Sequence, residues 1–324
     1  MRAKRSIFVL VLIAIAVLAI AIWRDPYAIV RAEYARQRIA AGLSTHEIEA
    51  GGYRWRYVER DAESADAPTL VLVHGYTGSK ENWYRLAEAL GRRYRLVIPD
   101  LPGWGESERK PGADYGYAAQ AANLAAFIDK IEDRPVILVG HSMGGGVAAV
   151  TAARYPDDVA RLGLLDASGV RFKDNQFGID VLAGKNPFGV TDEASLKAYL
   201  DILFNDDTGR PRIPWPASRG LIDKRRADGA FEQSVLDKIG RGDERFLPYD
   251  LAADIHQPTL LLWCRQDRVI DASALEIYAE RIPQAKKALL DGCGHMSLMQ
   301  QPGSVAGAID WLVGNPSVAK GPSP

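Results

Sequence analysis

The sequence is short of cysteine, and neither sign of charge is in excess. Its 324 residues contain two cysteines and 40 Lys and Arg against 41 Asp and Glu, which gives a net charge of -1. Two cysteines exclude a fold held by several disulfides, and the balanced charge gives no sign of nucleic-acid binding. The sequence also lacks a Cys, His and carboxylate cluster at metal-ligand spacing and the phosphate-binding pattern G-x-x-x-x-G-K-[ST]. We therefore expect no metal, no cofactor and no nucleic-acid partner.

The two cysteines each lie close to an apolar segment. Cys264 ends the run TLLLWC, and Cys293 comes shortly after the run ALL. Neighbouring strand ends could bring the two sulfur atoms together as a disulfide in an oxidising compartment. Unpaired cysteine is, however, among the most frequently buried residues. The sequence favours this second interpretation, in which the two thiols are separate and buried.

Long apolar runs are scarce apart from one at residues 7–23 (IFVLVLIAIAVLAIAIW). As a helix this run would extend about 26 Å at ~1.5 Å per residue, close to the thickness of a bilayer core. The basic residues before it favour a cytoplasmic N-terminus, with the rest of the chain on the periplasmic side of a bacterial inner membrane. We expect residues 1–24 to be an uncleaved membrane anchor. The alternative is a signal peptide cleaved at Ala19-Ile20-Ala21, followed by secretion.

Residues 27–43 (YAIVRAEYARQRIAAGL) have a composition that favours a helix. This segment could lie along the membrane surface, with Trp23, Tyr27 and Tyr34 at the level of the lipid headgroups. It could equally be an amphipathic helix that packs on the following domain. We expect a juxtamembrane helix within residues 25–45 and leave the two alternatives open.

Beyond this segment, apolar runs alternate with helical patterns, which is typical of a mostly parallel sheet with helices on both faces. The runs fall at residues 53–58, 69–73, 95–98, 135–139, 162–165, 259–263 and 288–290. The alternation breaks over residues 168–248, where Pro and Gly interrupt irregular helical patterns. We therefore expect a core made of residues 46–167 and 249–313, a helical cap or lid at 168–248 and a disordered tail at 314–324.

The pattern G-x-S-x-G occurs at Gly140-His141-Ser142-Met143-Gly144, between an apolar run and a helix-forming segment. A serine hydroxyl is a weak nucleophile unless a sharp turn lifts it off the strand toward a base. Glycine on both sides lets the strand and the helix approach closely around that turn. The pattern predicts that Ser142 is a catalytic nucleophile.

A serine nucleophile requires a base and an acid, which this arrangement places downstream in the order Ser, acid, His. His295 lies in a glycine-rich loop after an apolar run, and we predict that it is the base. His141 is beside Ser142, but its ring is expected to point away. For the acid we choose Asp267, in the loop after the run at 259–263, over Asp166, which follows the run at 162–165.

Oxyanion stabilisation requires two backbone N–H donors. In this kind of site one donor comes from the residue after the nucleophile and the other from the loop after the third strand. The apolar run at 69–73 is followed directly by His74-Gly75-Tyr76-Thr77-Gly78-Ser79. We therefore predict that the backbone N–H groups of Tyr76 and Met143 form the oxyanion hole.

The chain resembles the α/β-hydrolase fold superfamily, in particular its membrane-anchored monoacylglycerol lipase-like and bacterial esterase and lipase branch. The resemblance covers residues 45–313 and depends on the segments HGYTGSKENW, PDLPGWGES and GHSMG, together with Asp267 and Gly294-His295. It implies an α/β fold with a mostly parallel eight-stranded sheet, helices on both faces and an inserted helical cap.

The predicted activity is hydrolysis of a carboxylic ester through an acyl-enzyme, with monoacylglycerol or a similar apolar acyl ester as substrate. Alternatives on the same fold are a carbon–carbon bond hydrolase, an amidase or peptidase, a perhydrolase, or a binding protein without catalysis. Hydrolases of this fold that attack with Asp are disfavoured because Ser142 stands at the nucleophile position. Within the cap, Phe188, Phe204 and Trp215 are candidates for the wall of an acyl pocket, and packing of cap against core is the alternative.

Overall fold

The computed structural model describes residues 2–314, so most of the predicted tail lies outside the described residues. One mixed sheet of eight strands forms the centre of the domain, in the order β1-β2-β4-β3-β5-β6-β7-β8. The strands are β1 (Ser44–Ala50), β2 (Tyr53–Arg60), β3 (Thr69–Val73), β4 (Arg95–Pro99), β5 (Val136–His141), β6 (Val159–Leu165), β7 (Thr259–Cys264) and β8 (Lys286–Leu290). From β4 to β8 neighbouring strands are parallel, whereas β1 and β2 are antiparallel.

The predicted α/β fold with eight strands is confirmed, and each of the seven apolar runs falls on a strand. Every residue of β3, β5 and β7 is buried, as expected for parallel strands covered on both faces. The sequence pattern missed β1, because its sequence STHEIEA is polar and mostly exposed at the sheet edge. Strand β1 pairs with β2 across the turn at Gly51-Gly52, where both glycines have positive φ.

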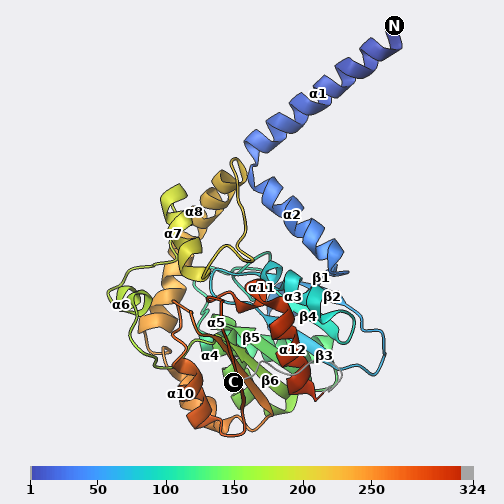
Figure 1. Ribbon diagram of the computed structural model, residues 1–324. Helices are drawn as coiled ribbons and strands as arrows, with labels where there is room; N and C mark the ends of the chain where they lie inside the picture. The colour runs from blue at the N-terminus through green and yellow to red at the C-terminus, as the bar shows by residue number, and fades with distance from the viewer. Residues whose placement is uncertain (1, 315–324) are drawn as a thin grey trace.

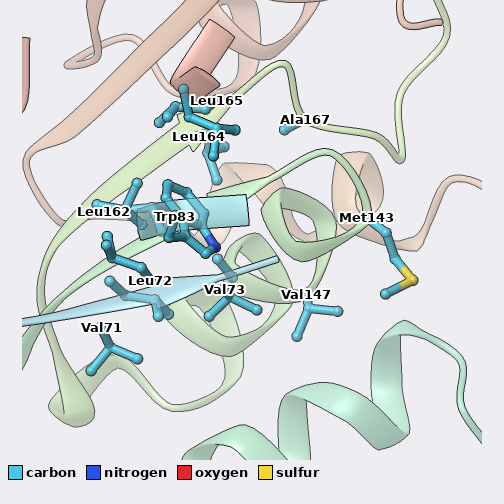
Figure 2. Packing of buried hydrophobic residues seen from close by; sticks show 14 of the residues in the cluster. Val71, Leu72, Val73, Trp83, Met143, Val147, Leu162, Leu164, Leu165 and Ala167 are labelled. Carbon is cyan, nitrogen blue, oxygen red and sulfur yellow. The ribbon is translucent and has the colours of Figure 1, made fainter. Parts of the chain in front are cut away.

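Helices cover both faces of this sheet (Figure 1). Helix α3 (Tyr84–Leu90) packs on α12 (Pro302–Val313), and α4 (Tyr117–Ile131) packs on α5 (Met143–Arg154). Of two shorter helices, α10 (Ala274–Arg281) packs on β7, and α11 (Ser297–Gln300) packs on α12 and α3. Figure 2 shows how apolar side chains from β3, β6 and α5, together with Trp83, fill the core between these layers. The start of α5 is thereby fixed against the sheet.

The cap lies between β6 and β7 in the chain. It contains α6 (Gln176–Leu182), α7 (Glu193–Leu203), α8 (Ala217–Leu236) and the short α9 (Leu247–Leu251). A small apolar cluster of Val190, Leu196 and Ile222 holds α7 on α8. Buried Arg225 on α8 donates hydrogen bonds to both carboxylate oxygens of Glu232 and to the backbone oxygen of Phe188. The cap is therefore an ordered, internally bonded unit.

Two helices precede the domain. Helix α1 (Arg2–Arg24) projects away from the rest of the molecule (Figure 1), and its segment Ser6–Arg24 is long and apolar enough to cross a membrane. The apolar side chains of this segment are exposed, so α1 fits a membrane anchor. Helix α2 (Tyr27–Ala40) packs on α8 and α3. Of the two alternatives for residues 27–43, the structure has the helix packed on the domain.

Candidate active site

Ser142 occupies a strained turn between β5 and α5. Its φ of 55° and ψ of -122° are unusual for a residue with a side chain. A Cβ on Gly140 would overlap the carbonyl of Gly144, and a Cβ on Gly144 would overlap the carbonyls of Val73 and His74. Because no larger residue fits at either position, the glycines permit the close packing of strand and helix that places Ser142 at the end of β5.

The predicted base and acid are in contact. The ring of His295, which lies in the loop after β8, donates from Nδ1 to Oδ2 of Asp267 at 2.8 Å. Asp267 follows β7, and its Oδ1 accepts the backbone N–H groups of Val269 at 2.7 Å and Ile270 at 3.1 Å. These bonds hold the carboxylate of Asp267 in position. The carboxylate in turn favours the tautomer of His295 that carries its proton on Nδ1. The Nε2 atom is then left as an acceptor.

Burial determines the ionisation of this pair. Burial lowers the pKa of His295 to about 3, so the ring is neutral near neutral pH.

A second carboxyl, Asp166, is also fully buried. Burial and then the charge of Asp267 raise the pKa of Asp166 well above its usual range. Burial also raises the pKa of Asp267, while the backbone N–H groups of Val269 and Ile270 act to lower it. Because Asp267 accepts these two N–H groups and the Nδ1–H of His295, we assign the negative charge of the two carboxyls to Asp267 and the proton to Asp166.

Asp166, the alternative acid, follows β6 and faces different partners. Its Oδ1 accepts the backbone N–H of Cys264 at 2.9 Å, and its Oδ2 contacts the hydroxyl of Ser297 at 2.6 Å. It thus links the end of β7 to the helix after the His295 loop. Of the two carboxyls weighed from the sequence, Asp267 is the one hydrogen-bonded to His295.

The expectation of two separate thiols is wrong, because Cys264 and Cys293 form a disulfide with their Cα atoms 5.4 Å apart. Strands β7 and β8 are parallel neighbours with Cys264 opposite Leu290. Their ends therefore bring the acid loop and the base loop together. The bond joins these two loops covalently, three residues before Asp267 and two before His295. Both cysteines are fully buried.

The loop after β3 lies against the nucleophile turn. A Cβ on Gly75 would be 2.9 Å from Cβ of Ser142, so glycine is required at this contact. His74 holds the loop from behind: Nδ1 donates to the backbone oxygen of Gly75, and Nε2 accepts the N–H of Leu101. Burial lowers the pKa of His74 to about 4, which keeps this bonding pattern at neutral pH. Among the described residues, no protein acceptor takes the backbone N–H of Tyr76 or Met143.

An ionic cluster around the buried side chains of Lys80 and Asp100 supports the same loop, and sequence analysis missed it. The ammonium of Lys80 lies 2.7 Å from Asp100, 2.8 Å from Glu106 and 2.9 Å from Glu81. Burial disfavours the charged ammonium, but the carboxylates of Asp100 and Glu81 outweigh it and raise the pKa of Lys80. The backbone N–H of Lys80 also bonds to Asp100. The motif segments at 74–83 and 99–107 gave the only sequence signal for this cluster.

The cap is bonded to the same loop. The hydroxyl of Tyr76 donates to the backbone oxygen of Glu232 and accepts a bond from Asn186. The hydroxyls of Thr77 and Tyr199 lie 3.1 Å apart.

Across the site, Nε2 of His141 donates to the backbone oxygen of His295 at 2.7 Å. This support of the base loop by His141 was missed because its position beside Ser142 gives no sequence signal for the contact.

Two pockets meet at Ser142 and share Tyr76, Ser142 and Phe188 as walls. The larger, about 630 Å³, has a mostly apolar wall that includes Met143, Val170, Phe177, Val181, Leu236 and Ile239. The smaller, about 310 Å³, carries polar groups from Asn82, His141, Tyr199 and His295. The predicted pocket position of Phe188 thus agrees with the structure, and its ring stacks on Tyr76.

The other two aromatic candidates lie elsewhere. Phe204 is buried in the core and is part of neither pocket wall. The chain around it supports the base loop instead, because the carbonyl of Leu203 accepts the N–H of Met296. Trp215 lies on the surface with 67% of its area exposed, just before α8. The prediction for Trp215 is wrong, because this exposed side chain is part of neither pocket wall at Ser142.

The fold and this arrangement of a strand-end serine, a histidine and two buried carboxyls define an α/β protein of the hydrolase type. The sequence profile of the alpha/beta hydrolase fold family matches residues 68–302, and the chain belongs to this family.

Three relatives illustrate the similarity. The monoacylglycerol lipase ABHD6 of Rattus norvegicus is 28% identical over 296 residues, which cover 89% of this chain and 87% of the relative. A crystal structure of a membrane phospholipase A, described as a bacterial virulence factor, is 31% identical with a TM-score of 0.84, over 97% of this chain and 100% of that one. A lipase structure from Acinetobacter baumannii is 26% identical with a TM-score of 0.78, over 88% and 96%.

Proposed function

We propose that the protein is a serine hydrolase that cleaves carboxylic esters with an apolar acyl chain, such as monoacylglycerols. The observation that carries this proposal is the pair of pockets that meet at Ser142. The larger, apolar pocket suits an acyl chain, and the smaller, more polar pocket suits an alcohol such as glycerol. The names of the relatives, a monoacylglycerol lipase and a phospholipase A, support an acyl ester as substrate.

In the proposed mechanism, Nε2 of His295 takes the proton of Ser142 as the hydroxyl attacks the ester carbonyl. The ion that forms on His295 is stabilised by Asp267, which lies 2.8 Å from Nδ1. The oxyanion accepts the N–H groups of Tyr76 and Met143. Removing one such donor typically costs about 3 to 4 kcal/mol of transition-state stabilisation. The alcohol leaves with the proton from His295, and water activated by the same ring hydrolyses the acyl-enzyme.

The proposed location is the outer face of a membrane, with α1 as an uncleaved anchor and the domain on the periplasmic side in a bacterium. Basic residues before the apolar run support this orientation. The disulfide between Cys264 and Cys293 supports it independently, because such bonds persist in oxidising compartments.

Labelling by a fluorophosphonate tests the nucleophile. Wild-type protein should be labelled, and Ser142→Ala should lose both the label and, on the order of 10⁶-fold, the turnover. Ser234→Ala is the matched control, because this serine is exposed on α8. Full activity in Ser142→Ala would refute the assignment. Turnover of amides or carbon–carbon substrates with no ester cleavage would refute the ester proposal while leaving the nucleophile intact.

Hydrolysis of p-nitrophenyl esters from acetate to palmitate tests the apolar pocket. Each buried methylene contributes up to about 0.8 kcal/mol, so kcat/KM should rise up to about fourfold per methylene until the pocket is full. Val181→Phe narrows the pocket and should move the optimum to shorter acids. Ile179→Phe, on the exposed side of the same helix, should not. A wild-type preference for acetate over octanoate would contradict the proposal.

A further inference from the structure

The most exposed aromatic side chain of the cap is Trp215, with 67% of its area accessible. It lies in the segment Pro211–Pro216, which joins the end of the α7 region to α8. The neighbouring residues Arg212 and Pro214 are exposed as well. A large exposed indole on an ordered loop is a candidate contact site, because tryptophan has an apolar ring and a polar N–H.

This loop lies beside the end of the anchor. Figure 1 shows α8 beginning at the corner between α1 and α2. In the first turn of α8, the guanidinium of Arg219 lies over the ring of Trp23 at 5.1 Å from its centroid. One residue later a Cβ on Gly220 would overlap the backbone of Pro26 and Tyr27. The start of α8 is therefore in direct contact with the residues at which α1 ends.

This contact limits how far Trp215 can lie from the end of the anchor. Trp215 precedes Arg219 by four positions, two of them before α8 begins, so their Cα atoms are at most about 10 Å apart at ~3.6 Å per extended and ~1.5 Å per helical residue. If residues 7–23 span the bilayer, Trp23 is at the membrane–water interface, and Trp215 is at nearly the same level. Tryptophan is enriched at that level because its ring suits the headgroup region.

The charges at this corner suit an anionic lipid surface. Arg24 and Arg212 are exposed. The nearby acidic groups are already occupied: Asp25 pairs with Arg31, and Asp223 pairs with Arg219 and Arg226. The carboxylate of Glu193 accepts a hydrogen bond from the hydroxyl of Ser218. Basic side chains near a membrane surface are attracted to anionic headgroups.

We propose that the segment Pro211–Pro216 is a second membrane contact, with the ring of Trp215 inserted among lipid headgroups beside the end of α1. This inference rests on the proposed anchoring by α1. The partner is the bilayer in which α1 is embedded. Because Arg225 of α8 bonds to the backbone of Phe188, the contact would hold the cap, and with it a wall shared by both pockets, at a fixed height above the membrane.

Spin labels on introduced cysteines test the contact in the full chain. Both native cysteines are buried in the disulfide, so an added cysteine is labelled specifically. We would label Trp215→Cys, Trp23→Cys and the matched control Trp311→Cys, an exposed tryptophan of α12. Each protein is reconstituted in vesicles of phosphatidylcholine and phosphatidylglycerol. The accessibility of each label to oxygen, which concentrates in lipid, is then compared with its accessibility to a water-soluble nickel chelate.

For the labels at positions 215 and 23, the ratio of accessibility to oxygen over accessibility to the nickel chelate should be several-fold higher than for the label at 311. If position 215 matches 311 while 23 remains lipid-like, the membrane contact is refuted and the anchor stands. If position 23 also matches 311, the anchoring itself fails, and the contact fails with it. If position 215 is shielded from both reagents, it faces protein, such as a second copy of this chain, and the bilayer contact is again refuted.

Discussion

Ser142 is held in its unusual backbone conformation by its neighbours. Its N–H donates to the carbonyl of Leu165, and its carbonyl accepts the N–H groups of Gly145, Gly146 and Ser168. A positive φ at a residue with a side chain costs on the order of 1 to 3 kcal/mol, and the surrounding bonds must offset this cost. The Ser142 hydroxyl is thereby presented at the junction of the two pockets without a change in the backbone.

The two buried carboxyls considered as the acid, Asp267 and Asp166, allow a test of their roles. Asp267→Asn should lower kcat on the order of 10⁴-fold, because the amide no longer favours the tautomer with a proton on Nδ1. Asp166→Asn should keep most of the activity. Its amide oxygen can still accept from the N–H of Cys264. Its NH2 group can donate to the hydroxyl of Ser297, which in the wild type donates to Oδ2 of Asp166 and can rotate to accept. Steady-state kinetics on a soluble ester would measure both, and the reverse ranking would show that Asp166 is the acid.

The pH dependence follows from the burial of His295. Since burial lowers its pKa from 6.5 to about 3, the neutral base persists in acid. The acidic limb of kcat/KM against pH should therefore lie below pH 6.5 in the free enzyme. An acidic limb at or above pH 6.5 would contradict this expectation.

Folding must be monitored in the same pH range. Below pH 6.5 the unfolded chain binds a proton at this histidine, whereas the folded protein does not until about pH 3. The free energy of unfolding therefore decreases as the pH falls from about 6.5 to about 3. Circular dichroism at each pH would separate loss of structure from protonation of the base.

At the scale of elements, the ends of parallel strands could be predicted well because their signals are local. A buried strand followed by a polar loop identified Ser142, Asp267 and His295, and the sheet brings these loops to one edge. The disulfide could not be predicted in the same way. It depends on the register between β7 and β8, which sequence alone does not specify.

The cap shows a second limit of sequence-based prediction. Phe188, Phe204 and Trp215 are all aromatic residues in irregular segments, and the sequence contains no periodicity that separates a pocket wall from the core or the surface. Only the path of the chain places Phe188 at Ser142, Phe204 under the base loop and Trp215 beside the anchor. The strand β1 was missed for another reason, since an exposed edge strand lacks an apolar run.

The disulfide between β7 and β8 should contribute measurably to stability. It closes a loop with a sequence separation of 29 residues, so the double variant Cys264→Ala/Cys293→Ala should lose about 3 to 4 kcal/mol of unfolding free energy. Urea denaturation of the soluble domain would measure the loss. A reductant should lower the stability of wild-type protein toward that of the double variant and leave the variant unchanged. Equal midpoints for oxidised wild type and the variant would contradict this role.

At the scale of the whole molecule, α1 exposes an apolar surface far larger than a soluble domain normally carries. We expect the full chain to sediment with membranes and to resist carbonate extraction. A chain that begins at Arg24 keeps the contact of Pro26 with Gly220 and should be soluble and active on short esters. Fractionation and esterase assays check both expectations. A mature N-terminus at Ile22 in membrane-free material would show that the segment is a cleaved signal peptide.

The position of β8 as the last strand of the sheet has a consequence for biosynthesis. Protein synthesis and membrane translocation proceed from the N-terminus, so α1 and the Ser142 turn are made long before residue 295. An incomplete chain that ends before β8 contains the proposed nucleophile but neither its proposed base nor the second cysteine of the disulfide. By the proposed mechanism such a chain cannot attack an ester. If the domain lies on the periplasmic side, as proposed, the hydrolase would thus become active only after nearly its entire length has crossed the membrane.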